Sequence, residues 1–383
     1  MTRRLTVLTE IIAPYRIPVF NALAKREGID LHVIFLSETD AGLRQWRVYK
    51  DEIRFSYEVL PSRRIRAGKR NWLLNWGLRS ALNRYSPEAV ICGGYNYGAS
   101  WGALRWARRH HAAFVLWSES NRLDQRNEYV WVESLKRYFV SRCDGFVVPG
   151  KSSVEYLRLL GAPEERIVTA PNAVDNACFK REAESARRQD ALIRAQLDLP
   201  QRYILFVGRM VPEKGVLDLL EAYAKLEGEV RSEVGLVFAG DGALRAEIME
   251  RAKQVRPGTI RCPGFAQRDD LAKFYALAEA LVLPTHSDPW GLVVNEAMAC
   301  GLPVIVSEVA GCARDLVDDG WNGYVTPRGD PEKLQAVLLL LLGQPEVRQE
   351  MGMHSYEKIQ HYSPEACAEG LAAAAVLLAR EKR

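Results

Sequence analysis

Short apolar runs alternate with segments of helical spacing along the whole chain. Most of the runs are continuous, which is typical of strands buried on both faces of a parallel sheet. The predicted strands are residues 5–9, 30–36, 89–92, 113–117, 145–148 and 167–170 in the first half, and 203–207, 235–239, 259–262, 280–283, 303–306 and 323–325 in the second. Helical segments, including 216–223, 269–278 and 293–300, lie between the strands. The pattern therefore predicts an α/β protein with doubly wound, Rossmann-like sheets.

A charged segment separates the two series of strands. Residues 180–196 read KREAESARRQDALIRAQ, have no strand pattern, and are soon followed by Pro200. The chain has 383 residues, which is long for a single core. We therefore expect an N-terminal domain over 1–180 and a C-terminal domain over 200–360. Two such sheets are expected to face each other across a cleft, where a ligand would bind.

The charge is divided unevenly along the chain. Residues 1–175 carry 27 Lys and Arg against 18 Asp and Glu, although the net charge of the whole chain is only +4. A basic first half indicates an anionic partner, which would be a membrane surface, a phosphate-bearing substrate or a nucleic acid. The alternative is an ordinary solvated surface.

The cysteines and the apolar runs indicate the cellular compartment in which the protein is expected. The seven cysteines form no Cys-x-x-Cys pair, and none has histidines at zinc spacing. Reduced thiols in a cytoplasmic protein are the simplest interpretation. No run reaches the ~18–20 apolar residues that a membrane span requires. The apolar run near the N-terminus is short and reads as a first strand, not as a signal peptide.

The segment 286–306, HSDPWGLVVNEAMACGLPVIV, carries the strongest chemical signal. A polar loop follows the strand 280–283, and a helix is predicted to start near Gly291. The backbone N–H groups of Gly291, Leu292 and Val293 would then be donors without intrahelical acceptors. Such a helix N-terminus suits a diphosphate, and Gly291 would let the anion come close.

Two carboxylates flank this helix start. Asp288 lies in the loop before the helix, and Glu296 lies inside the helix. Carboxylates commonly hold sugar rings by accepting hydrogen bonds from hydroxyl groups. We therefore predict that both contact hydroxyl groups of a ligand. The alternative is a capping role for Asp288 and an exposed helix acid at Glu296.

A second signal lies at 207–215, VGRMVPEKG. The strand 203–207 ends at a turn with Gly208, and the cations Arg209 and Lys214 follow. Two cations at the carboxyl end of a buried strand can bind a diphosphate leaving group. The alternative is a surface loop with two solvated cations. The Gly-x-Gly at 240–242 is interpreted as a tight turn, because the third glycine of a dinucleotide site is absent.

Four pieces of the second half, in order, carry a family resemblance. VGRMVPEKG, AGDGALR, PGFAQRDDL and DPWGLVVNEAMACGLPVI resemble the retaining glycosyltransferases of family 4, which have the GT-B fold. The stretch 167–179, IVTAPNAVDNACF, is similar to the family's strand and following loop. The family has two glutamates separated by seven residues, whereas this chain has Asp288 in place of the first.

The resemblance implies a role for each matching position. Arg209 and Lys214 would bind the diphosphate of a nucleotide sugar, Asp288 the transferred sugar, and Glu296 the ribose. The other donor-binding positions would be Gly208, Gly264, Phe265, Ala266, Gly291, Leu292 and Val293, with residues 264–266 meeting the nucleobase. Family members need no metal ion and no cofactor, so the nucleotide sugar, UDP- or GDP-linked, would be a substrate only. The C-terminal helix 364–383 would cross back to the N-terminal domain.

The acceptor side is less defined. Glu119 follows the strand 113–117, where many family members place a histidine, so it is a candidate catalytic residue; the alternative is a structural acid at a strand end. The acceptor would be a hydroxyl group of a glycan, a lipid-linked sugar or a small molecule. Residues 61–76, PSRRIRAGKRNWLLNW, would lie on an anionic membrane, giving a peripheral enzyme at its inner face. A cationic loop followed by a helix is the alternative.

Given the resemblance, we expect no nucleic-acid partner for the basic first half. Two rival functions stay open at this point. One is another enzyme on the same fold, such as a nucleotide-sugar epimerase or a phosphorylase. The other is a non-catalytic protein that binds nucleotide sugars.

Overall fold

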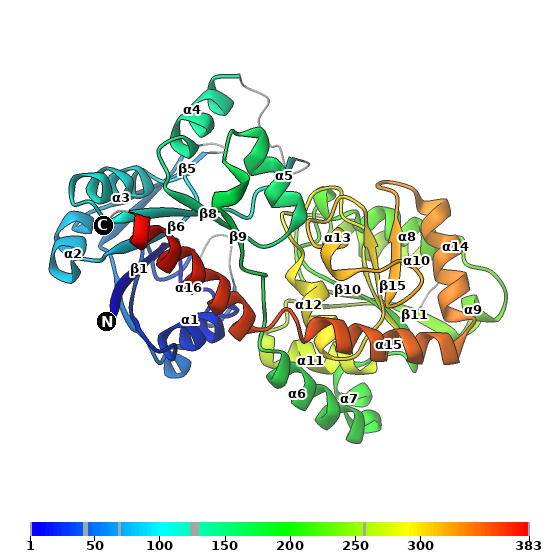
Figure 1. Ribbon diagram of the computed structural model, residues 1–383. Coiled ribbons are helices and arrows are strands. Elements are labelled where there is room, and N and C mark those ends of the chain that lie inside the picture. Colours follow the sequence, from blue (N-terminus) through cyan, green and yellow to red (C-terminus); the bar gives the residue numbers. More distant parts are fainter. Residues whose placement is uncertain (1, 41–44, 68–69, 123–129, 256–257, 382–383) are drawn as a thin grey trace. The chain divides into compact units, whose positions relative to one another are not determined.

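The chain forms two compact units in a computed structural model, which describes residues 2–40, 45–67, 70–122, 130–255 and 258–381 (Figure 1). Unit 1 comprises Met1–Val174 and Ser363–Arg383, and unit 2 comprises Asp175–Tyr362. Each unit is built on its own parallel sheet. None of the helices in these described ranges has an apolar stretch long enough to span a bilayer.

Unit 1 contains a sheet of seven parallel strands. These strands are β1 (Arg3–Thr9), β2 (Ile29–Phe35), β3 (Ser56–Val59), β6 (Ala89–Gly93), β7 (Ala113–Trp117), β8 (Gly145–Val148) and β9 (Ile167–Thr169). Their order across the sheet is β3-β2-β1-β6-β7-β8-β9. Because both faces of the sheet are covered, all of the β7 side chains are buried.

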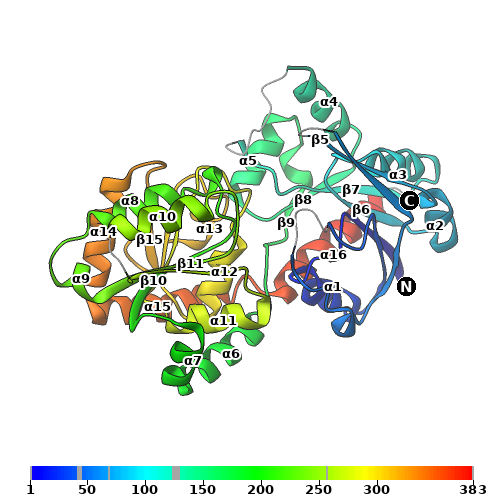
Figure 2. The same cartoon turned by 180° about the vertical axis from the view of Figure 1, so that it is seen from behind.

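Helices cover the sheet of unit 1 on both faces. They are α1 (Arg16–Ala24), α2 (Leu78–Tyr85), α3 (Gly98–Arg109), α4 (Val130–Val140), α5 (Lys151–Leu159) and α16 (Pro364–Glu381), with short 3-10 turns at Lys50–Glu52 and Glu164–Arg166. Alternate β1 residues enter two separate cores. Leu5 and Val7 pack in the core with α1 and α16, whereas Leu8 packs in the core with α2–α5. Figures 1 and 2 show α1 and α16 side by side on one face.

A two-stranded antiparallel hairpin completes unit 1. Its strands are β4 (Ser62–Ala67) and β5 (Arg70–Asn75). For residues 61–76 the sequence analysis gave two alternatives, a membrane-binding stretch or a cationic loop followed by a helix. The predicted helix is wrong. Backbone pairing between the two strands, with Arg64 opposite Leu73, forms a sheet where a helix was expected.

Unit 2 contains a sheet of six parallel strands. They are β10 (Arg202–Val207), β11 (Val234–Ala239), β12 (Ile260–Gly264), β13 (Ala280–Leu283), β14 (Val304–Ser307) and β15 (Gly323–Thr326). Their order is β12-β11-β10-β13-β14-β15. The central strands are almost wholly apolar and buried, as the continuous runs in the sequence predicted.

The helices of unit 2 also lie on both faces of its sheet. They are α6 (Asn176–Arg188), α7 (Asp190–Leu197), α8 (Val216–Ala224), α9 (Gly228–Glu233), α10 (Arg245–Val255), α11 (Arg268–Leu277), α12 (Leu292–Ala299), α13 (Ala313–Leu316), α14 (Pro331–Leu342) and α15 (Pro345–Ile359), with a 3-10 turn at Pro212–Lys214. Helices α8, α10 and α14 share one core, while α11 and α12 pack together beside α6.

The segment 180–196 is not a linker. It forms α6 and α7, and both belong to unit 2, so the chain divides at Val174 and not between residues 180 and 200. Arg187 of α6 donates hydrogen bonds to the carbonyl groups of Ala276 (3.2 Å) and Cys300 (2.6 Å). These bonds satisfy two carbonyl groups near the C-terminal ends of α11 and α12 and hold α6 against them.

Candidate functional site

The candidate site lies where the strand order of unit 2 reverses. Strands β10 and β13 are neighbours, with β11 and β12 on one side and β14 and β15 on the other. In open α/β sheets, ligands bind at the carboxyl ends of the strands on either side of such a reversal. The segment after β10 contains Arg209 and Lys214, and the segment after β13 contains Asp288. The structure therefore brings two separate sequence signals to one switch point.

Backbone contacts fasten these two segments together. The carbonyl oxygen of Glu213 accepts hydrogen bonds from Thr285 Oγ1 (2.8 Å), His286 N (2.9 Å) and Ser287 N (3.2 Å). Gly215, with φ +63°, passes so close that an added Cβ would lie 1.9 Å from the carbonyl oxygen of Pro284. The site is therefore built on fixed backbone.

Lys214 and Asp288 form an ion pair across this junction. Their side chains are only 15% and 13% exposed. An ion pair that is largely removed from water is much less screened than a surface pair. A cation and a carboxylate held in contact could bind a phosphate oxygen and a sugar hydroxyl group at adjacent points. The interpretation of Lys214 as a solvated surface cation does not fit this burial.

Glycine segments line the ends of the other strands. Gly208 N donates to Ala239 O (3.0 Å), and Gly240 N donates to Gly264 O (2.8 Å). A Cβ added to Gly240, where φ is +153°, would lie 1.9 Å from the carbonyl oxygen of Gly208. The Gly-x-Gly at 240–242 is thus a tight packing turn, as predicted. It supports Gly208 and Gly264, two of the expected donor-binding positions.

This close contact gives a stability prediction. We expect Gly240→Ala to lower the free energy of unfolding of unit 2 by about 3 kcal/mol, because the methyl group meets backbone and not a movable side chain. Gly329→Ala is the matched control: φ is +66°, but nothing lies within 4 Å of the added Cβ. It should cost about 1 kcal/mol from backbone strain alone. Equal losses in thermal denaturation would show that the close approach does not matter.

The helix predicted at 293–300 is α12, and Gly291 precedes it with φ +100°. Its first intrahelical hydrogen bond runs from Val294 N to Gly291 O (2.9 Å). The amides of Leu292 and Val293 lie ahead of that bond and therefore point out of the helix N-terminus. The positive φ at Gly291 favours glycine there, and an added Cβ would lie 2.8 Å from Leu283 Cδ2.

Glu296 is not the exposed helix acid that the alternative interpretation offered. The buried hydroxyl group of Tyr275 in α11 donates to Glu296 Oε2 (2.6 Å). Burial raises the pKa of Glu296 to about 7, although the Tyr275 hydrogen bond opposes the rise. A carboxyl group that is costly to ionise inside the fold is typical of a functional position.

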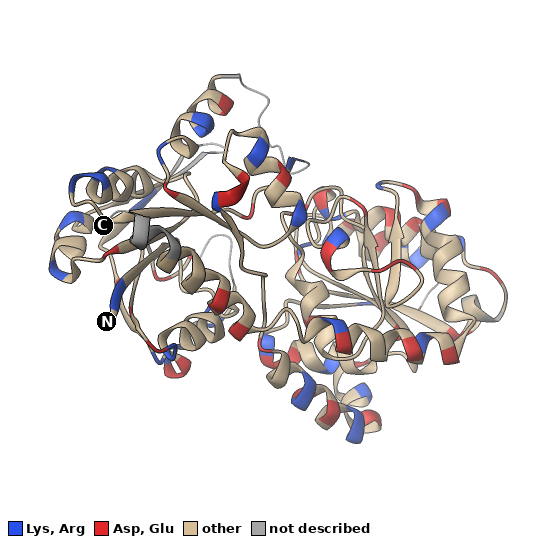
Figure 3. Cartoon of the chain, in the orientation of Figure 1, with Lys and Arg blue, Asp and Glu red and all other residues tan. Residues whose placement is uncertain are grey.

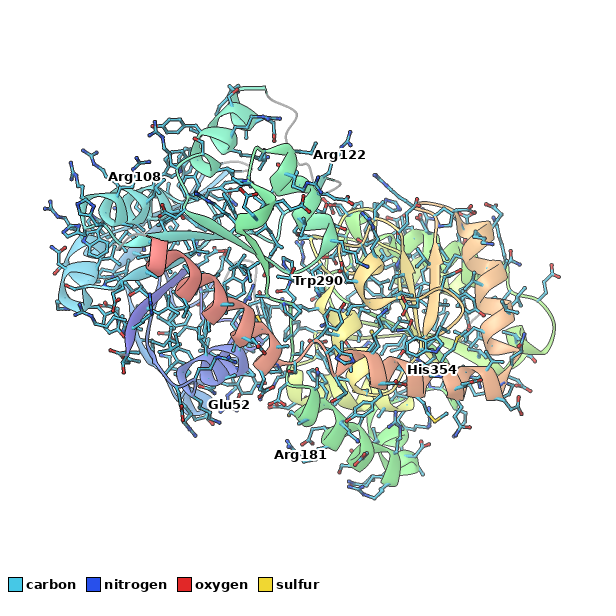
Figure 4. The ribbon with its side chains drawn as sticks, in the orientation of Figure 1. Glu52, Arg108, Arg122, Arg181, Trp290 and His354 are labelled. Carbon is cyan, nitrogen blue, oxygen red and sulfur yellow. The ribbon has the colours of Figure 1, made fainter. Side chains whose placement is uncertain are left out.

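Two side chains of the site were missed at the sequence level. Tyr275 lies 21 positions before Glu296, in a helix that gave no chemical signal. His286 Nε2 hydrogen bonds with Asp218 Oδ2 of α8 at 2.5 Å, which adds a side-chain contact beside the three hydrogen bonds to Glu213. Trp290, labelled in Figure 4, is buried and donates from Nε1 to Asn295 Oδ1 (2.8 Å), which fixes the loop before α12.

The remaining predicted residues lie in more open positions. Arg209 is exposed at the end of β10. Phe265, 42% exposed, and the half-buried Ala266 lie between β12 and α11. An exposed ring at the carboxyl end of a sheet strand can stack on a flat base. Within the described ranges, no three His, Cys, Asp or Glu side chains are grouped as metal ligands.

Glu119 belongs to unit 1, at the end of β7. It accepts a hydrogen bond from Arg16, whose guanidinium lies 3.8 Å from the centre of the Trp117 ring. The sheet of unit 1 reverses between β1 and β6, and Glu10 follows β1 there. Arg64 of the hairpin reaches Glu10 at 3.4 Å. Unit 1 thus carries ion-paired carboxylates at the carboxyl edge of its own sheet.

Two family sequence models match most of the chain between them. The model described as Glycosyl transferases group 1 matches residues 189–358, and that described as Glycosyltransferase Family 4 matches residues 20–177. The chain belongs to these glycosyltransferases. The structure agrees with their fold, because both units are doubly wound Rossmann-like domains.

Curated relatives of this family match only part of the chain. O-antigen chain mannosyltransferase B of Escherichia coli is 31% identical over 220 residues, covering 56% of each chain. D-inositol 3-phosphate glycosyltransferase of Segniliparus rotundus is 32% identical over 216 residues, covering 55% of this chain and 47% of the relative. The chain thus spans about half the length of the curated relatives it matches.

Solved structures match the fold over nearly all of the chain. HepE of Anabaena, solved with UDP and glucose, has a TM-score of 0.73 at 15% identity and covers 97% of this chain and 98% of its own. Sucrose-phosphate synthase of Thermosynechococcus elongatus has a TM-score of 0.74 at 19% identity, covering 99% and 100%. At these identities the likeness shows the GT-B fold alone.

Proposed function

We propose that this protein transfers a sugar from a nucleoside diphosphate sugar to a hydroxyl acceptor, in the cytoplasm, with retention and without a metal ion. The observation that carries the proposal is the Lys214–Asp288 ion pair at the switch point of unit 2. The amides that open α12 follow in the same loop. The membership of the family supports the reaction class, and the UDP and glucose named for the HepE structure fit a UDP-sugar donor.

The leaving group is the part of the donor that unit 2 would bind. The guanidinium of Arg209, the ammonium of Lys214 and the amides of Leu292 and Val293 would stabilise the charge on the departing diphosphate. Such stabilisation of developing charge is often the largest catalytic contribution. An incoming diphosphate would compete with Asp288 for Lys214, which would free this carboxylate to accept from the sugar hydroxyls.

The transfer step balances without a further reagent. The bond between the anomeric carbon and the diphosphate oxygen breaks, and the acceptor oxygen bonds to the same carbon from the same face. A phosphate oxygen of the leaving group takes the acceptor's proton. Glu296 would hold the ribose, and Phe265 with the backbone of Gly264 and Ala266 would meet the base.

The acceptor is assigned to the carboxyl edge of unit 1. Carboxylates paired with arginines, as at Glu119 with Arg16 and at Glu10 with Arg64, can accept hydrogen bonds from hydroxyl groups. A polyol acceptor, such as a glycan or the sugar of a lipid-linked carrier, fits this chemistry. Glu119 is a candidate catalytic residue because it follows the interior strand β7 at this edge.

A two-step assay tests the proposal against its rivals. A thermal-shift screen with UDP-, GDP- and ADP-sugars identifies the donor, since a ligand at ~100 times its Kd adds roughly 2.7 kcal/mol of stability. The donor is then incubated with and without sugar acceptors, with and without EDTA. Acceptor-dependent release of nucleoside diphosphate, unaffected by EDTA, and an unchanged anomeric configuration in the product are expected. Isomerised donor without acceptor would instead identify an epimerase, and binding without turnover a non-catalytic protein.

A further inference from the structure

The β4–β5 hairpin presents one apolar face to the solvent. In its register Ile65 lies opposite Trp72 and Arg63 lies opposite Leu74, so these four side chains share a face. Ile65, Trp72 and Leu74 are 43%, 54% and 46% exposed, and Trp76, just beyond the strand, is 53% exposed. Exposed aromatic and aliphatic side chains that adjoin one another indicate an interaction surface, whereas single ones do not.

The opposite face of the hairpin is fixed to unit 1. Leu73 is buried in the core, and Asn75 donates to Leu36 O (2.6 Å). Arg64 binds Asp40 (3.0 Å) and Glu10 (3.4 Å). Because these inward contacts hold the hairpin, its apolar face cannot be buried by a simple rotation of the strands.

A second exposed apolar stripe lies on α4. Trp131, Leu135 and Tyr138 are 63%, 46% and 52% exposed, and their spacing places them on one side of the helix. Phe139, which follows Tyr138 in the helix, is fully buried.

Contacts connect the hairpin with α4. Helix α3 packs against β5, and Trp101 of α3 stacks on Tyr138 of α4 with ring centroids 6.3 Å apart. Figures 1 and 2 agree in showing β5 beside α3 and α4. The hairpin face and the α4 stripe therefore belong to one region of unit 1.

This region is strongly cationic. Between Glu58 and Glu119 the sequence has ten Lys and Arg and a single acidic residue, Glu88. Arg63 on the hairpin and Arg105, Arg108 and Arg109 on α3 are exposed. Figure 3 shows basic positions on α2 and α3, and Figure 4 labels Arg108 on α3. Exposed tryptophan next to arginine and little acid fits an anionic headgroup layer over apolar chains.

We propose that the outward face of the β4–β5 hairpin and the α4 stripe form a docking surface for an anionic lipid bilayer. The tryptophans would enter the headgroup region while the neighbouring arginines bind lipid phosphates. The charge complementarity selects anionic lipid over a second copy of this chain, whose matching region would carry the same positive charge. Binding here needs no sugar transfer, so the proposal stands or fails separately from the proposed function.

Co-sedimentation of the full chain with vesicles tests this surface. Vesicles of phosphatidylcholine mixed with phosphatidylglycerol should bind the protein, and vesicles of phosphatidylcholine alone should bind it much less. Raising the salt concentration should weaken the binding. The double variant Trp72→Thr with Trp76→Gln, and separately Leu135→Gln, should each lower the apparent affinity about 10-fold.

Matched controls come from unit 2. Leu192→Gln and Met353→Gln remove side chains that are 54% and 61% exposed, and they should leave vesicle binding unchanged. Melting temperatures equal to that of the parent protein would show that the hairpin variants fold. Absence of binding to anionic vesicles, or equal binding by all variants, would overturn the proposal. The protein could instead fail to bind vesicles but form a dimer or an RNA complex that the hairpin variants lose. That result would overturn the proposal in favour of the other partner.

Discussion

Replacing Arg209 by alanine is expected to lower kcat/KM for sugar transfer by about 10²- to 10³-fold. Arg209 is exposed at the end of β10, so its removal takes away the charge that we propose binds the leaving diphosphate, without opening the core. The melting temperature should stay within about 1 °C of the parent protein, because surface substitutions of this kind change stability little. Initial rates with the donor identified by the screen measure the loss.

The matched control for Arg209 is Arg181→Ala. Arg181 lies on α6, is 67% exposed, and contacts Glu182 and Cys178 Sγ of the same helix, away from the switch-point loops. It should transfer sugar at the parental rate. Full activity of Arg209→Ala would contradict the assignment of the leaving-group site.

Replacing Glu296 by glutamine should make the protein more stable but a poorer donor binder. Its pKa is about 7 in the fold and near 4.5 when unfolded, so the folded state binds the proton more tightly. The parent protein therefore loses stability as the pH rises from about 4.5 to 7, by up to about 3 kcal/mol. Glu296→Gln removes this loss and should raise the melting temperature at pH 8, with no gain below pH 4.5.

Donor binding should change in the opposite direction. An ionised Glu296 accepts stronger hydrogen bonds from hydroxyl groups than a neutral amide does, so Glu296→Gln should weaken donor binding about 10-fold or more at pH 8. Donor affinity of the parent should rise with pH through about 7, whereas that of the variant should stay flat. Calorimetric titrations from pH 6 to 8 measure both.

Tyr275→Phe separates the two effects of Glu296. This change keeps the carboxyl group and removes the hydrogen bond that favours its ionised form, so the pKa of Glu296 should rise further. The rise in donor affinity should then shift to higher pH. An unchanged pH profile in both variants would show that Glu296 does not hold the donor.

The sequence predicted the buried part of the fold well. All twelve predicted strands are present, with ends that differ by at most two residues. Their continuous apolar runs are the signature of strands covered on both faces. The strand β3 was missed because it lies at a sheet edge with half-exposed side chains. The hairpin was missed because cations dominate β4 and because β5 has apolar side chains on both faces, with Leu73 buried between the exposed Trp72 and Leu74.

The predicted domain boundary was wrong because of a charged segment. Residues 180–196 read as a linker because their charged face dominates the composition, yet Arg187 and the buried Ala183 fasten α6 to unit 2. The return of α16 to unit 1 was expected only from the resemblance, because no local pattern tells which sheet a terminal apolar helix will cover.

The loops of the candidate site could be predicted from the sequence, but the contacts between its side chains could not. Glycines, cations and carboxylates at strand ends marked Arg209, Lys214, Asp288 and the start of α12. The Lys214–Asp288 contact joins residues 74 positions apart, and the Tyr275 bond to Glu296 depends on how two helices pack. Such contacts are set by tertiary packing and leave no spacing in a single sequence.

A crystal structure of the protein with a bound nucleoside diphosphate would test the central claim most directly. We predict phosphate oxygens within hydrogen-bond distance of the Leu292 and Val293 amides, of Lys214 Nζ and of the Arg209 guanidinium, with the ribose on Glu296. A diphosphate bound elsewhere, with the Lys214–Asp288 pair and the α12 amides untouched, would contradict the account.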